Sequence, residues 1–110
     1  MAYDEQLADR IRTLLGDRAG LTEKKMFGGL AFLLDGNMAI AASGQGGILV
    51  RVDPEESDEL VATTPAQPME MRGRQMAGWL RVDTAEVADD TALAEWVGRG
   101  AAYAGSLPPK

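Results

Sequence analysis

The sequence of 110 residues contains no cysteine and no histidine. No disulfide framework can form, and the usual nitrogen and sulfur ligands of a zinc site are missing. Nucleophilic catalysis by a cysteine, or by a serine that a histidine activates, is excluded as well. Carboxylates are plentiful, but nearly all fall in the first turns or on the exposed faces of predicted helices, where they favour the helix dipole. We therefore expect a protein that is not an enzyme and that holds no cofactor and no metal.

Long apolar runs are also missing, since none approaches the roughly 18 residues that span a membrane. We expect a cytoplasmic protein without membrane contact. With 45% hydrophobic residues the chain can bury one core, and its length suits a single domain over residues 1–110.

Basic residues are in the minority, because 11 lysines and arginines stand against 17 aspartates and glutamates, for a net charge of −6. Nucleic-acid affinity rests largely on the neutralisation of phosphates, so an acidic domain begins with a disadvantage there. Six basic residues nevertheless lie on or beside predicted strands, namely Lys24, Lys25, Arg51, Arg72, Arg74 and Arg81. They indicate either a local basic face or a solvated sheet edge whose charged side chains prevent pairing with strands of other chains, and we favour the second interpretation.

Apolar residues at helical spacing predict a first helix with one buried face made of Leu7, Ile11, Leu14 and Leu15. Asp53 as N-cap and Pro54 at the first helical position predict a second helix that ends near Thr63. A last helix carries on one face Leu93, Trp96, Val97, Gly100 and Ala104. Gly100 with Ala104 four residues later indicates close approach of this helix to a sheet or a partner.

Runs of apolar residues between turn signals predict strands over residues 25–34, 38–43, 48–52, 68–71 and 75–82. Residues 35–37, Asp-Gly-Asn, are the turn of a β-hairpin. The order is therefore α-β(3)-α-β(2)-α. Consecutive hairpins imply an antiparallel sheet with the helices mainly on one face, which is an α+β fold.

The glycine pair Gly28-Gly29 follows two lysines and invites comparison with a phosphate-binding loop. Such a loop needs its glycines before the lysine and a helix after it, whereas here the lysines come first and an apolar strand follows. We interpret the pair as a bulge or close-packing point that bends the first strand.

Strand alternation predicts which side chains share a face of the sheet. If Val50 and Leu80 pack under the helices, the open face carries Leu49, Arg51, Trp79 and Arg81. In the first strand the same alternation groups Lys25, Phe27 and Leu33, unless a glycine bulge resets it. Three interpretations of Trp79 stay open: a protein interface, a core position under a second helix, or a platform for single-stranded nucleic acid.

Four segments in order resemble the N-terminal domain of the TfoX/Sxy competence-regulator family: KKMFGGLAFLLDGNMAI, GGILVRVDPEE, QMAGWLRV and the ending W-V-x(5)-YAGSLPPK. The resemblance covers nearly the whole chain. It implies an α/β domain related to the secretion-chaperone type, whose members are typically dimers. Full-length members act as positive regulators of natural competence genes through a transcription-factor partner rather than as enzymes. The chain ends at Lys110 without their helical second domain, so we do not expect the competence role to transfer directly.

Together these observations predict a non-enzymatic regulatory or chaperone-like protein that works through protein–protein contacts, as a homodimer or with a partner such as a transcription factor. The expected contact residues are Phe27, Leu49, Arg51, Trp79 and Arg81. The alternative is a transcriptional regulator that binds nucleic acid directly, through the six basic residues named above.

Overall fold

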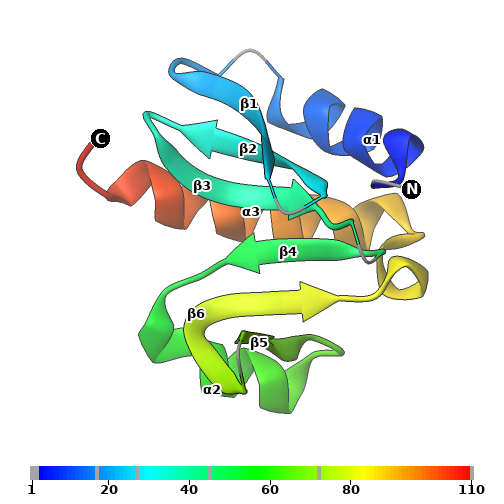
Figure 1. Cartoon of the computed structure of the whole chain (residues 1–110), viewed down its shortest axis with the longest axis vertical. Coiled ribbons are helices and arrows are strands. Elements are labelled where there is room, and N and C mark those ends of the chain that lie inside the picture. The colour runs from blue at the N-terminus through cyan, green and yellow to red at the C-terminus, as the bar shows by residue number, and fades with distance from the viewer. Residues whose placement is uncertain (1–2, 17, 27, 45, 72, 110) are drawn as a thin grey trace.

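The structure of the chain, a computed structural model, describes residues 3–16, 18–26, 28–44, 46–71 and 73–109, with the side chains at 26, 71 and 74–77 outside the described set. Figure 1 shows the elements in their order: α1 (Glu5–Leu15), β1 (Leu21–Met26), β2 (Gly29–Leu34), β3 (Asn37–Ala42), β4 (Ile48–Arg51), α2 (Pro54–Thr63), β5 (Gln67–Met71), β6 (Arg74–Val82), the 3₁₀ helix η1 (Thr84–Val87) and α3 (Asp90–Ser106). The predicted α+β class is confirmed. Among the described residues one more strand than expected precedes α2, so the order is α-β(4)-α-β(2)-α.

The strands form one sheet in the order β1-β2-β3-β4-β6-β5, and neighbouring strands are antiparallel throughout, as predicted. Figure 1 shows α3 crossing behind β3 and β4. α1 packs on both α3 and β3, whereas α2 packs on β6 and β5. Among the described residues no helix combines the length and the apolar character needed to cross a membrane.

The helices begin where the sequence places aspartates. Asp53 accepts a hydrogen bond of 2.9 Å from the Glu55 amide, and Pro54 follows at the first helical position, as predicted. Asp4 and Asp89 cap α1 and α3 in the same way. Each cap satisfies an amide that the helix itself leaves without a partner.

The prediction of one continuous strand over residues 25–34 is wrong. β1 and β2 are antiparallel with Met26 opposite Gly29, so the chain reverses between these two residues. Gly28 has a φ of 76°, which suits a tight hairpin loop. A Cβ on Gly29 would lie 2.4 Å from the carbonyl oxygen of Ala42, so the pair is a close-packing point but not a bulge. The sequence hid the reversal because Met26 before it and Leu30 after Gly29 are both apolar and continue the pattern of one strand.

The core lies between the sheet and the helices α1 and α3. Leu7, Ile11 and Leu15 of α1 are buried as predicted, but Leu14 is 37% exposed. The buried arc of α1 is rotated toward Ala8, which is 2% exposed, and this rotation leaves Leu14 at the margin of the arc. The spacing identified the helix correctly but could not place the edge of its buried face.

The predicted close approach of α3 is confirmed, and its target is the sheet. A Cβ on Gly100 would lie 2.4 Å from the carbonyl oxygen of Ala39 and 3.4 Å from Cγ1 of Val50. The missing side chain lets the helix backbone come down onto β3 and β4.

Candidate functional site

The two faces of the sheet differ in what covers them. On the face toward α1 and α3, which we call the inner face, Phe32, Ile40, Ile48, Val50 and Leu80 are at most 1% exposed. The side chains between them in sequence point to the opposite, outer face. Leu49, Arg51, Trp79 and Arg81 lie there and are half-buried, so the predicted division of β4 and β6 into two faces is confirmed.

Cross-strand pairing joins the outer face into one row across the whole sheet. Each neighbour in this row is the register partner of the next, from β1 to β5: Lys24, Ala31, Ala41, Leu49, Arg81 and Gln67. Thr22, Leu33 and Met38 form a second row at the β1 side. The outer face thus has an apolar centre with cations toward both ends.

Arg51 lies close to two aromatic rings. Its guanidinium carbon lies 5.4 Å from the ring centroid of Trp79 and 5.6 Å from that of Tyr103. Trp79 is its register partner on β6, whereas Tyr103 comes from α3. We call Arg51, Trp79 and Tyr103 the arginine–aromatic cluster. Both distances are within the range of cation–π attraction, so the rings restrict the position of the charge.

The remaining predicted contact residues differ in burial and in how fully the structure describes them. Trp79 is outside the buried core cluster, in contrast to the core position that one interpretation gave it. Phe27 and Arg72 lie outside the described residues, as does the side chain of Arg74. Arg81 is opposite Leu49 and engages in a further interaction of its own.

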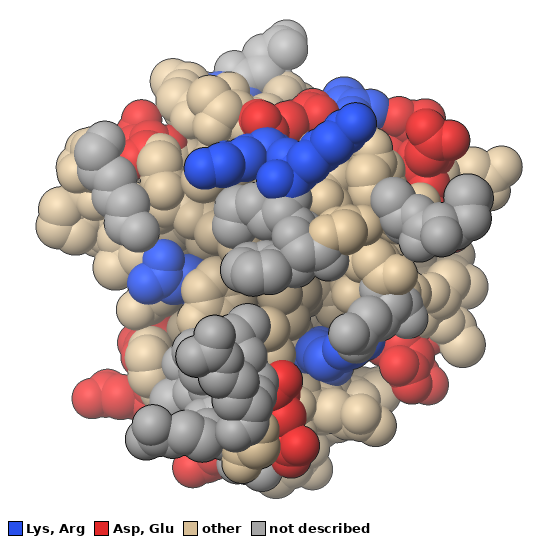
Figure 2. Space-filling model, viewed as in Figure 1, with Lys and Arg blue, Asp and Glu red and all other residues tan. Residues whose placement is uncertain are grey.

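The two adjacent lysines, Lys24 and Lys25, lie on opposite sides of the sheet. Lys24 is opposite Ala31 and lies on the outer face, but Lys25 is opposite Leu30 and lies on the inner side, so the predicted grouping of Lys25 with Leu33 is wrong. The cause is the β1–β2 hairpin, which changes the alternation assumed for one long strand. Figure 2 shows the outer face, where the described Lys and Arg side chains stand in separate groups and Asp and Glu side chains are also visible.

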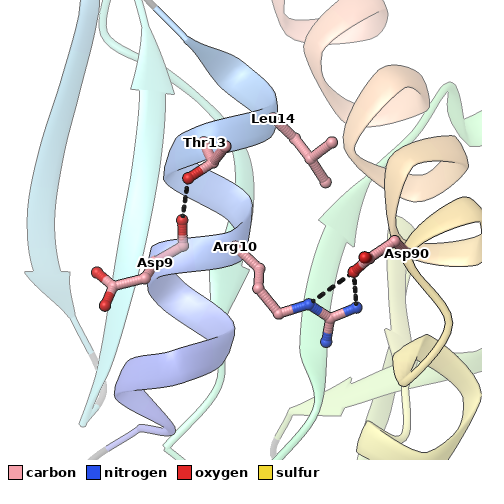
Figure 3. Close-up of a pocket in the computed structure, with 5 residues that line it drawn as sticks. All are labelled: Asp9, Arg10, Thr13, Leu14 and Asp90. Atoms are coloured by element: carbon pink, nitrogen blue, oxygen red, sulfur yellow. Dashed lines mark hydrogen bonds and ion pairs between the residues drawn. The ribbon is translucent and has the colours of Figure 1, made fainter.

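A hollow of about 310 Å³ lies between α1 and the start of α3 and is lined by Asp9, Arg10, Thr13, Leu14 and Asp90. Figure 3 shows Arg10 reaching across to Asp90 while Asp9 points away from Arg10. Arg10 Nη2 donates to Asp90 Oδ1 at 2.7 Å and to the carbonyl oxygen of Val87 at 2.9 Å. The arginine is therefore already used to tie α1 to α3, and the hollow offers no acid–base pair for chemistry.

A second hollow, of about 300 Å³, lies between the start of α2 and α3. Its lining consists of Val52, Asp53, Glu56, Arg99, Ala102 and Tyr103. Arg99 lies over the ring of Trp96, with its guanidinium carbon 4.8 Å from the centroid. Tyr103 borders this hollow and also contacts Arg51, so the hollow adjoins the arginine–aromatic cluster. In the part of the chain that is described, no group of three acidic residues is placed to hold a metal ion.

A family model described as the TfoX N-terminal domain matches residues 13–104. The chain belongs to this family. No match was found among curated proteins or among solved structures. The matched TfoX N-terminal segment includes the whole sheet and both residues of Gly28-Gly29, and it ends just beyond Tyr103.

Sequence reasoning missed Tyr103 as a member of the TfoX N-terminal domain's candidate site. The face predicted for the last helix was made of Leu93, Trp96, Val97, Gly100 and Ala104 and did not include Tyr103. Its contact with Arg51 joins a helix and a strand that lie far apart in sequence, so no local pattern announces it. The sequence offered one signal, which is that Arg51 and Tyr103 both lie in segments that resemble the family.

Proposed function

We propose that this TfoX N-terminal domain is a non-enzymatic regulatory or chaperone-like protein that acts through protein–protein contacts made by the outer face of its sheet. The observation that carries the proposal is the arginine–aromatic cluster beside Leu49, in which Arg51 and Trp79 of the outer face meet Tyr103 of α3. Tryptophan, tyrosine and arginine are the residues that most often dominate binding energy at protein interfaces.

The partial burial of the arginine–aromatic cluster suits a role in protein binding. Arg51 and Trp79 are half-buried before any partner arrives, so little side-chain freedom is left to lose on binding. The mixed surface, with apolar Leu49 and a cation, also resembles the composition of interface centres. Membership of the family adds that the domain is like that of a competence regulator. A transcription factor or a second copy of the chain is the kind of partner that we propose, in the cytoplasm.

Direct binding of nucleic acid has less support. Of its six proposed contacts, Lys24 and Lys25 are on different faces of the sheet, so they do not form one basic surface. A gel-shift series at falling salt concentration tests it, since phosphate contacts require affinity that rises steeply at low salt.

The central test is Trp79→Ala, with Leu14→Ala as a control at an exposed leucine on the helical layer. We expect Trp79→Ala to keep a folded circular-dichroism spectrum and a cooperative melt but to lose self-association in light scattering, or capture of a partner from the native host. Leu14→Ala is expected to change neither. Unfolding of Trp79→Ala without a folded monomer would assign Trp79 to the core and contradict the proposal.

A further inference from the structure

Cations predominate in the paired rows of the outer face, although Glu70 is exposed on β5 at the edge of the sheet and Figure 2 shows Asp and Glu side chains around this face. In the paired rows that run from β1 to β5, the charged side chains are Lys24, Arg51 and Arg81. The carboxylate next to Lys24 in sequence, Glu23, is opposite Phe32 on the inner side and is held there by Arg12. The chain as a whole has a charge of −6, so this face is a local exception.

The acidic residues account for the contrast because they gather in the helices and at the helix starts. In and beside α1, α2 and α3 these are Asp4, Glu5, Asp9, Asp53, Glu55, Glu56, Asp58, Glu59, Asp83, Glu86, Asp89, Asp90 and Glu95. Most acidic residues therefore lie in the helical layer, whereas cations predominate in the paired rows of the outer face. Such a field attracts an acidic ligand to one side of the molecule.

Arg51 is prepared to receive a carboxylate. Two rings lie near its guanidinium, and stacking of this kind leaves the in-plane N–H donors available. Among the described residues no carboxylate forms an ion pair with Arg51. A planar guanidinium held in place binds a carboxylate through two parallel hydrogen bonds with little further ordering.

The surface between the cations is apolar. Ala31 and Ala41 are 1% and 6% exposed, so the accessible part of this strip consists of the half-buried Leu33, Met38 and Leu49. A ligand that matches the outer face thus combines carboxylates at its ends with apolar side chains in the middle.

We propose that the outer face binds a segment of another protein that contains both acidic and apolar side chains. This proposal rests on the function proposed above. A carboxylate of the segment pairs with Arg51, a second lies near Lys24, and the apolar side chains cover Leu49 and Leu33. Of the two kinds of partner proposed above, a second copy that presents the same face fits less well than an acidic segment of another protein, because it would set Arg51 and Lys24 against like charges. Nucleic acid is also a poor match, because the described residues of the apolar strip include no row of rings on which bases stack.

The test uses two synthetic peptides as probes: one built of glutamate and leucine, and a control with lysine in place of every glutamate. Binding to the full chain is measured by fluorescence anisotropy, and the contact surface is mapped by amide and indole shifts in NMR. The variants are Arg51→Gln and Lys24→Gln. Lys25→Gln is the matched control, since it removes the same charge from the neighbouring residue on the other side of the sheet.

We expect the glutamate–leucine peptide to bind and to shift the signals of Leu49 and Trp79, while the lysine peptide does not bind. Arg51→Gln should weaken binding about tenfold, the loss of one charged hydrogen-bonding partner, and Lys24→Gln should weaken it less. Lys25→Gln should leave the affinity unchanged. Equal effects of Lys24→Gln and Lys25→Gln, or shifts confined to the helical layer, would overturn the proposal.

Two further measurements separate this proposal from the broader one. If Trp79→Ala abolishes partner capture or self-association while Arg51→Gln and Lys24→Gln change nothing, protein contact stands and the acidic segment is refuted. If a single-stranded oligonucleotide binds at the same face and is weakened by the same variants, the ligand is nucleic acid and the proposal is overturned.

Discussion

The inner and outer faces of the sheet are made by the same strands, yet they follow different rules. On the inner face Phe32, Ile40 and Val50 are excluded from water, and Gly100 of α3 sits directly on the backbone of β3. On the outer face Leu49, Arg51 and Trp79 stay half-buried, and Arg51 lies against rings from two different elements. Close packing of side chains characterises the inner face, whereas charged and partly exposed aromatic side chains characterise the outer face.

We expect inner-face residues to contribute more to the free energy of unfolding than outer-face residues do. An inner-face side chain fills space that no other residue can fill, so its loss leaves a cavity. An outer-face side chain can be shortened while solvent takes its place. Substitutions at alternate residues of the same strands should therefore have unequal effects on unfolding.

The largest expected effect is at Phe32, which is 0% exposed at the centre of the inner face. Phe32→Ala should lower the free energy of unfolding by about 3–5 kcal/mol, through lost burial and a cavity. Leu49→Ala on the outer face should cost only about 1 kcal/mol, in proportion to the smaller apolar area that it removes. Urea denaturation followed by circular dichroism measures both. Similar losses at the two positions would break the distinction between the faces.

An intermediate effect is expected from two glycines of α3 that lie on different sides of the helix. At Gly100 a methyl group would meet the Ala39 carbonyl oxygen at 2.4 Å, whereas at Gly98 nothing lies within 4 Å. Gly100→Ala should destabilise the protein by about 1–3 kcal/mol, because the helix must move off the sheet. Gly98→Ala should stabilise it by up to about 1 kcal/mol through helix propensity. Thermal melts of the two variants give the comparison, and a stabilising Gly100→Ala would contradict the close approach.

The smallest effect concerns Glu23, which marks the inner side of β1. Arg12 donates to both of its carboxylate oxygens, at 2.6 and 2.9 Å, and this holds the pKa of Glu23 below its usual range, although partial burial acts in the other direction. Because the folded pKa is depressed, the stabilisation is present above the unfolded pKa of about 4.3 and is lost as the pH falls through the folded value.

Both side chains are more than a third exposed, at 43% for Arg12 and 34% for Glu23, so solvent screening limits the contribution to at most about 1 kcal/mol. Glu23→Gln should lower stability by that amount at neutral pH and remove this part of the acid dependence. Urea midpoints measured at pH values from neutral to strongly acidic provide the check. A variant with the same slope as the parent protein would show that the pair contributes nothing.

Much of the architecture was predictable because it rests on local rules. Alternation divided Leu49 and Arg51 from Val50 correctly, and Asp53 with Pro54 located the start of α2. The hairpin at residues 35–37 was also found, because Asp35 and Gly36 accept the positive φ values, 51° and 85°, that its turn requires. The β1–β2 hairpin was missed, since its flanking residues resemble strand rather than turn.

The sequence by itself determined the family, the α+β class, the two-sided strands and the absence of cysteine and histidine chemistry. The tertiary structure alone decided which lysine faces outward and that Tyr103 of α3 meets Arg51 of β4. The tertiary structure also brings the start of β3 next to the segment after α3, where Asn37 Nδ2 donates a hydrogen bond of 2.9 Å to the Pro108 carbonyl oxygen. Periodicity and capping act between neighbours in the chain and can be read from it. Contacts between distant elements depend on how the packed sheet and helices bring them together.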